Sequence, residues 1–453
     1  MDGKAENGTE SGDGIEGAVS SPSRAAATVE DIKPTEELPN DEPQQGFESV
    51  AFGGGEMDEP RPRRIHILGF SAHARFIAHA IASTPGVPVS IIAHHPKVMT
   101  RWGEEKRMLS LYDSAGRHTS SVEIPCPEAL LASPQSRRSV ADPDYFLDHV
   151  IVDVMSAAIL PSLAALRHRI DSQTTICLLQ PGLGLMERLN EAVFTDPVTR
   201  PNFVLGHSTH LVSKFSSLLY SMKYKRSGGL YLHAVSRSAE DPPPDQSSID
   251  EGKQQSQHLA RLLSSAETLN VTGLSWDRFL ARKLPWLIFC SAADAICVSL
   301  GCRYKAIYHN PHARNLWENL LDETAVIVSQ LPELTPEKRL YFAGNGFRRQ
   351  LRTFLVAMGP SISPWISRVR WGEVPPVDYF NGYIVRRAQE LGLDHTHNAV
   401  ALETVKARML ARSWELRNDV LGSRPYMMDK DLVDGGQHTP NQDDILELEL
   451  DGL

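Results

Sequence analysis

Short runs of β-branched residues alternate with helical stretches through the first half of the chain, between residues 64 and 235. Strands and helices repeated in this order are typical of a parallel sheet that carries helices on both faces. From residue 259 to 424 the apolar residues recur at helical spacing instead. The sequence therefore predicts an α/β fold class, with an N-terminal Rossmann-type doubly wound parallel sheet and a mostly α-helical C-terminal domain. The expected strands cover residues 65–68, 89–92, 149–152, 175–179, 203–205 and 230–234.

Three polar segments mark the ends of these two domains. Residues 1–62 are acidic and rich in Gly, Ser, Pro and Glu, and we expect them to be disordered because they cannot bury enough apolar surface to fold. Residues 237–257 include the run Asp-Pro-Pro-Pro-Asp and are predicted to be a linker or an exposed insertion. Residues 428–453 form a second acidic tail, in which the alternation at 445–450 suits a short docking strand. The folded domains are then expected at 63–236 and 258–427.

The net charge of −10 hides a basic middle. Residues 1–60 carry a net charge of −12 and residues 429–453 a net charge of −7, which leaves +9 for residues 61–428. A basic core suits an anionic ligand such as a dinucleotide phosphate, and it equally suits RNA. A basic solvated surface would show the same charge, so the charge alone leaves these alternatives open.

Cysteine and hydropathy patterns set the expected environment. The five cysteines include no C-x-x-C pair, and His207 and His210 lack a spaced third ligand, so we expect neither a disulfide framework nor a metal site. No run of about 18 apolar residues is present, so no membrane span is expected. The first ten residues lack a signal core and an Arg-rich presequence, which predicts a cytoplasmic protein. A mitochondrial location is the alternative, because import can use internal signals and a basic stretch begins at Arg61.

A glycine turn follows the first predicted strand, where a dinucleotide-binding fold has its G-x-G-x-x-G motif. Only the first glycine of that motif is present, but the residues at the other two positions, Ser71 and Ala74, are small. Such a turn brings helix N–H groups to a pyrophosphate. The predicted pyrophosphate-binding residues of this first domain are Gly69, Phe70, Ser71, Ala72 and Ala74.

The second predicted strand ends without the acidic residue that binds a ribose 2′-hydroxyl. His94 and Lys97 lie there instead, which favours NADP over NAD as cofactor, although an ordinary basic loop would look the same. The turn Gln180-Pro181-Gly182 follows a later strand, and Gly182 is a further candidate for cofactor contact.

Two segments of the second half resemble the ketopantoate reductase family. Residues 276–295 begin with Trp276 and include the step Arg282-Lys283-Leu284, as in a long helix of that family. Residues 377–383, Val-Asp-Tyr-Phe-Asn-Gly-Tyr, are similar to the family segment E-I-D-Y-I-N-G-Y. With the glycine turn and the closing helix included, the resemblance covers residues 64–425 in the family's order.

The resemblance implies a Rossmann domain and a helical domain of the 6-phosphogluconate dehydrogenase C-terminal type, with the active site in the cleft between them. The family reduces 2-dehydropantoate to pantoate with NADPH, in pantothenate biosynthesis. Lys283 matches its general acid, a role that requires a cation beside the developing alkoxide. Ser291 and Asp294 lie in the first matched segment, and Ser363 begins the second, whose resemblance extends from residue 363 to 383. These three are the residues predicted to bind substrate.

Other family positions differ here. Family asparagines correspond to Pro181, Leu287 and Ser291, a lysine corresponds to Met155, and a glutamate that holds the substrate corresponds to Pro376. Two hypotheses follow. The chain is either an NADP-dependent reductase of a small-molecule keto acid or ketone, for which a homodimer is one expected assembly, or a non-catalytic relative that binds a dinucleotide, RNA or a protein partner.

Overall fold

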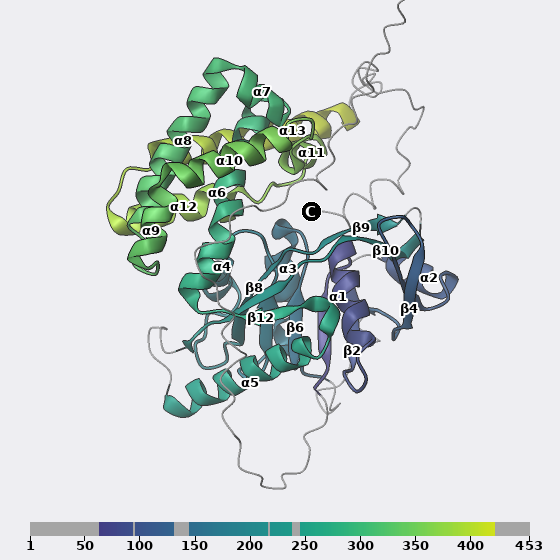
Figure 1. Cartoon of the computed structure of the whole chain (residues 1–453). Coiled ribbons are helices and arrows are strands. Elements are labelled where there is room, and N and C mark those ends of the chain that lie inside the picture. Colours follow the sequence, from purple (N-terminus) through teal and green to yellow (C-terminus); the bar gives the residue numbers. More distant parts are fainter. Residues whose placement is uncertain (1–62, 94–95, 131–144, 216–217, 238–244, 422–453) are drawn as a thin grey trace, which may run out of the picture.

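The computed structural model describes residues 63–93, 96–130, 145–215, 218–237 and 245–421. Both predicted acidic tails, with the strand suggested at 445–450, lie outside the described residues. Figure 1 shows a sheet domain with a helical domain at one edge of the sheet. The mixed α/β class and the division into these two parts confirm the sequence prediction.

The main sheet has eight strands in the order β12-β11-β8-β7-β6-β1-β2-β5. Neighbouring strands pair in parallel except β11, which runs antiparallel to β8. Four central strands are buried along their whole length, because helices cover both faces of the sheet. The strands are β1 (Ile65–Leu68), β2 (Val89–Ala93), β5 (Glu128–Ala129), β6 (His149–Val152), β7 (Thr175–Leu178), β8 (Asn202–Ser208), β11 (Leu230–Ala234) and β12 (Val271–Gly273).

Helices cover the two faces of this sheet. On one face, α1 (Ala72–Ala82) packs apolar side chains such as Phe76 against β1 and β2, and α5 (Gln246–Ser264) packs side chains such as Leu259 against β7, β8, β11 and β12. On the other face, α3 (Ser156–Leu166) and α4 (Leu185–Ala192) pack Leu163 and Leu189 against β6 and β7. The remaining helix of this domain is α2 (Pro96–Glu104).

A second sheet, which the sequence did not predict, lies beside α1 (Figure 1). Its strand order is β4-β3-β10-β9, formed by β3 (Met108–Tyr112), β4 (His118–Glu123), β9 (Leu211–Phe215) and β10 (Leu218–Arg226). Tyr220 and Met222 of β10 are fully buried, and the Tyr220 ring meets Phe70 edge-on at a centroid distance of 4.9 Å. The small sheet therefore closes the core on the α1 side.

The helical domain is built around α6 (Trp276–Leu300), which is buried along most of its length from residue 279 to 298. By length and composition α6 could cross a membrane, contrary to the sequence expectation, but most of its apolar window is buried inside the protein. Trp317 and Trp365 pack around it. The surrounding helices are α7 (Tyr304–His309), α8 (Pro311–Ser329), α9 (Pro336–Ala343), α10 (Asn345–Ala357), α11 (Pro364–Arg370), α12 (Asn381–Leu391) and α13 (Thr396–Leu421).

The predicted boundary between the domains needs correction. Residues 246–257, expected in a linker, form the first part of α5, and the Asp245 carboxylate caps this helix by accepting a hydrogen bond from Ser248 N at 3.1 Å. β12, in the region assigned to the mostly helical domain, pairs with β11. The sheet domain therefore continues to residue 273, and the helical domain begins with α6.

Candidate functional site

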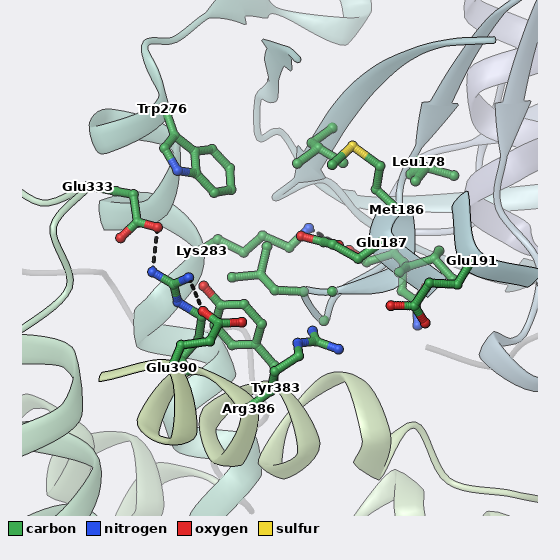
Figure 2. Close-up of a pocket in the computed structure, with 17 residues that line it drawn as sticks. Leu178, Met186, Glu187, Glu191, Trp276, Lys283, Glu333, Tyr383, Arg386 and Glu390 are labelled. Carbon is green, nitrogen blue, oxygen red and sulfur yellow. Dashed lines mark hydrogen bonds and ion pairs between the residues drawn. The ribbon is translucent and has the colours of Figure 1, made fainter. Parts of the chain in front are cut away.

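A cavity of about 210 Å³ lies where the carboxyl ends of β7 and β8 face the helical domain (Figure 2). The first turn of α4 lines one side, and α6 and α12 supply Lys283, Arg386 and Arg387. Ligands of open α/β sheets bind at this edge of the strands. The cavity therefore lies in the cleft where the family resemblance predicts the active site.

Lys283 lies in the second turn of α6 with only 2% of its surface exposed. Its ammonium donates hydrogen bonds to the carbonyl oxygens of Gln180 at 2.6 Å and Gly206 at 3.2 Å. Burial lowers the pKa of Lys283 to about 7, while the nearby Cys177 opposes the shift. A lysine with a pKa near neutrality can hold or release a proton under physiological conditions.

The other two cations of the cavity differ in their partners. Arg387 forms ion pairs with Glu333 and Glu390, which Figure 2 shows as dashed lines. Arg386 lies over the Tyr383 ring at 5.9 Å from its centroid, and no ion pair to it is recorded among the described residues. Glu187 and Glu191 of α4 also line the cavity, so its overall charge is nearly balanced. Arg386 is therefore a candidate for binding an anionic group, and the sequence analysis did not identify it.

The turn before α4 is pressed against the helical domain. At Gly182, an added Cβ would lie 2.5 Å from Tyr379 Cβ, and the Leu183 N–H donates to Tyr379 O at 2.9 Å. At Gly184, whose φ is 87°, a Cβ would lie 1.8 Å from an Arg386 nitrogen. The approach of the Tyr379 backbone requires glycine at 182, whereas at 184 the positive φ requires it, because the Arg386 side chain can move. Gly182, predicted as a cofactor contact, lines the cavity and contacts the helical segment Val377–Tyr379 (η6).

The first glycine turn has the geometry of a tight strand-to-helix connection. Gly69 has a φ of 127°, and a Cβ there would lie 2.1 Å from the Asp153 carbonyl oxygen. Ser71 caps α1 by accepting a hydrogen bond from Ala74 N at 2.9 Å. Phe70 and Ala74 point into the core, which leaves Gly69, Ser71 and Ala72 of the predicted set at the helix end.

The sequence predicts that two residues, His94 and Lys97, select NADP. His94 lies outside the described residues, and so does the side chain of Lys97, whose backbone belongs to α2. Their role stays a prediction.

The three residues predicted to bind substrate gather in a separate buried cluster inside the helical domain. Tyr304 donates a hydrogen bond to Asp294 at 2.5 Å, and Ser363 also contacts this carboxyl, whose pKa is raised by burial. Asn381 donates to the carbonyl oxygen of Ser291 at 2.9 Å. None of Ser291, Asp294 and Ser363 lines the cavity, and their part in substrate binding stays a prediction.

Comparisons with known proteins agree with this architecture. The profile described as "Ketopantoate reductase PanE/ApbA" matches residues 65–223, and "Ketopantoate reductase PanE/ApbA C terminal" matches residues 278–409. No curated protein sequence matches the chain.

Several solved structures share the fold. The putative 2-dehydropantoate 2-reductase from Enterococcus faecalis has 16% identity and a TM-score of 0.55 over 77% of this chain and 99% of its own. A D-mandelate dehydrogenase with NADH and anilino(oxo)acetate has 15% identity and a TM-score of 0.55 over the same shares. The dimeric ketopantoate reductase from Staphylococcus aureus has 15% identity and a TM-score of 0.51, again over 77% and 99%. At such low identities the structural likeness shows only the shared fold. The two family profiles show the family. The chain belongs to the ketopantoate reductase PanE/ApbA family.

Proposed function

We propose that this chain is a nicotinamide-dinucleotide-dependent oxidoreductase that reduces a 2-keto acid or ketone, with Lys283 as the general acid. The observation that carries the proposal is the Lys283 ammonium, which is buried beside the cavity between the two domains and has a pKa of about 7. A general acid works best when its pKa lies near the operating pH. Family membership supports the same class of reaction.

The glycine turn after β1 fits a dinucleotide. Gly69 adopts a φ that favours glycine, and the close approach to Asp153 leaves no room for a side chain. α1 begins directly afterwards. Its Ala74 N–H is hydrogen-bonded to Ser71 Oγ, and the N–H groups that precede it lie at the helix end where a pyrophosphate would bind, near Ser71 and Ala72. The Asp153 carboxylate, which accepts a hydrogen bond from Ser71, opposes a second anion here.

When bound, the dinucleotide supplies the hydride for the ketone carbon. Lys283 then gives its proton to the developing alkoxide, and its two carbonyl partners fix the direction of the ammonium. We assign to Arg386 the carboxylate of the keto acid. Leu183, Met186 and Trp276 give the cavity an apolar side, which favours a substrate less polar than 2-dehydropantoate.

NADP is the proposed form of the cofactor. The basis is the sequence after β2, which is basic and lacks an acidic residue. The dimeric Staphylococcus aureus relative supports a homodimer as the proposed assembly. A cytoplasmic location is proposed from the sequence alone.

A second candidate function is non-catalytic binding of a dinucleotide, RNA or a protein partner. The specific observation in its favour is the loss of family polar groups at Pro181, Leu287 and Pro376, of which Leu287 is fully buried. A site without these groups would align a small hydroxylated substrate poorly, because each lost buried contact costs about 1–3 kcal/mol.

The test is NADPH and NADH binding to the full chain by calorimetry, followed by a panel of 2-keto acids that includes 2-dehydropantoate and an aryl-substituted member. Lys283→Ala should lower kcat by about 100-fold or more and leave NADPH binding intact. The exposed Lys305, replaced by Ala, is the matched control and should change neither quantity. Wild-type turnover should also fall as pH rises above about 7, because Lys283 loses its proton.

Two results would separate the candidates. Absence of NADPH and NADH binding at millimolar concentration would refute the reductase proposal. Binding without turnover of any keto acid in the panel would favour the non-catalytic function.

A further inference from the structure

Three side chains form a hydrogen-bonded array at the carboxyl edge of the main sheet, beside the glycine turn to which the dinucleotide is assigned above. His73 Nδ1 lies 3.2 Å from Asp153 Oδ2, and His73 Nε2 lies 2.7 Å from Ser208 Oγ. His73 is in the first turn of α1, Asp153 directly follows β6, and Ser208 ends β8. The carboxyl ends of β6 and β8 and the amino end of α1, which follows β1, lie at one edge of the sheet, and this brings the three distant residues together.

The two ring nitrogens of His73 have different partners, and this difference determines which nitrogen can accept a proton from Ser208. A carboxylate on Nδ1 holds the proton on that nitrogen, so Nε2 is left as an acceptor for the Ser208 hydroxyl proton. Asp153 is itself held by a hydrogen bond from Ser71 Oγ at 2.7 Å. Burial raises the pKa of Asp153, but His73 and Ser71 outweigh this effect and keep the pKa below its usual range. The carboxylate is therefore ionised at neutral pH.

The three groups are sheltered but reachable from solvent. The side chains of His73 and Asp153 are 15% and 19% exposed, and Ser208 is half-buried. A second pair offers a comparison, since Ser121 Oγ also lies 2.7 Å from a histidine nitrogen, that of His118. Within the described part of the chain, no carboxylate contact to His118 is recorded. The arrangement around His73 therefore has an orienting carboxylate that an ordinary surface serine–histidine pair lacks.

We propose that Ser208 is an activated nucleophile, with His73 as its base and Asp153 as a positioning residue, and that it hydrolyses small carboxylic esters. Ser208 Oγ bonds to the ester carbonyl carbon while His73 Nε2 takes the hydroxyl proton. The ester C–O bond then breaks, and the alcohol leaves with the proton that His73 returns. Water attacks the acyl-serine through the same base, which releases the carboxylic acid and restores Ser208. The cycle needs no oxidant or cofactor.

The first experiment treats the full chain with a fluorophosphonate probe, which loses fluoride when a serine oxygen attacks its phosphorus, and maps the labelled residue by mass spectrometry. Hydrolysis of p-nitrophenyl acetate is measured in parallel. Labelling is expected on Ser208 of the wild type. Ser208→Ala and His73→Ala should abolish it and lower ester hydrolysis about 100-fold or more, and Asp153→Asn should lower both.

Ser121→Ala is the matched control and should label and hydrolyse as the wild type does. The proposal is overturned if the wild type is not labelled at Ser208, if Ser208→Ala keeps its ester hydrolysis, or if Ser121→Ala loses as much activity. Should Ser208→Ala fail to fold, Ser208→Cys gives a second test: its new thiol should react with iodoacetamide faster than the exposed Cys126, and His73→Ala should remove this advantage.

The ester hydrolysis proposal and the reductase proposal can be refuted independently of each other. Probe labelling needs no dinucleotide, so a missing label on Ser208 leaves the reductase proposal untouched. Equally, an absence of NADPH binding does not change the labelling expected at Ser208.

Discussion

Replacement of Lys283 by methionine should remove a pH dependence that the buried ammonium imposes on the stability of the protein. The folded-state pKa of Lys283 is about 7, whereas its ordinary value is 10.5. Between these two pH values the unfolded chain binds more protons at this residue than the folded chain does. The wild type should therefore gain stability relative to Lys283→Met as the pH rises from 7 toward 10.5.

The size of the effect follows from the two pKa values. Each pH unit between 7 and 10.5 adds up to about 1.36 kcal/mol to the difference in unfolding free energy. The first unit adds less, because Lys283 of the folded protein is still half protonated at pH 7. Between pH 7 and pH 9, the free energy of unfolding of the wild type should rise by about 2 kcal/mol relative to the variant. Other titrating groups cancel in this difference, because both proteins contain them.

Urea unfolding at a series of pH values, followed by tryptophan fluorescence, measures the difference. Lys305→Met serves as the control, because Lys305 is exposed and its replacement should give a flat difference from the wild type. A flat difference for Lys283→Met, or one that falls as pH rises, would refute the reasoning. It would mean that the Lys283 pKa is not lowered by burial.

Three further outcomes follow from the packing and charge of single residues. Gly69→Ala should lower the unfolding free energy by about 3 kcal/mol or more, whereas Gly86→Ala, also at positive φ but in open space, should cost only about 1 kcal/mol in urea unfolding. Gly184→Ala should displace Arg386 and so raise the KM for a keto acid more than it lowers kcat, in steady-state assays. His149 is buried with its pKa lowered to about 3, so the wild type should lose about 2 kcal/mol between pH 6 and pH 4 that His149→Leu does not lose. Equal acid sensitivity of the two proteins would contradict this result.

The main sheet could be predicted because its central strands are short continuous apolar runs buried on both faces, as at 65–68 and 149–152. The second sheet could not. β4 is polar and mostly exposed, and β3 finds its parallel partner in β10, far along the chain. The start of α5 was missed for a related reason: its inward face there consists of Gly252 and Ser256, which give no apolar period.

The candidate site was predicted only in part. Lys283 was found through the resemblance of α6, but its partners are backbone carbonyl oxygens, which have no sequence signal. The contacts of His73 reach 80 residues along the chain to Asp153 and 135 to Ser208, so no short motif contains them. Ser291 and Asp294 were predicted from the same helix as Lys283, yet they lie about two to three turns further along α6, where the helical domain encloses it.

The hydrogen bond from the Leu183 N–H to Tyr379 O makes it possible to measure how often the two domains separate. An amide proton exchanges with solvent only when its hydrogen bond breaks, and this bond joins the turn before α4 to η6 of the other domain. The hydrogen–deuterium exchange rate at Leu183 therefore reports the frequency with which the sheet domain and the helical domain separate at the cavity. Any ligand that binds across both domains should slow that exchange, whatever its chemistry.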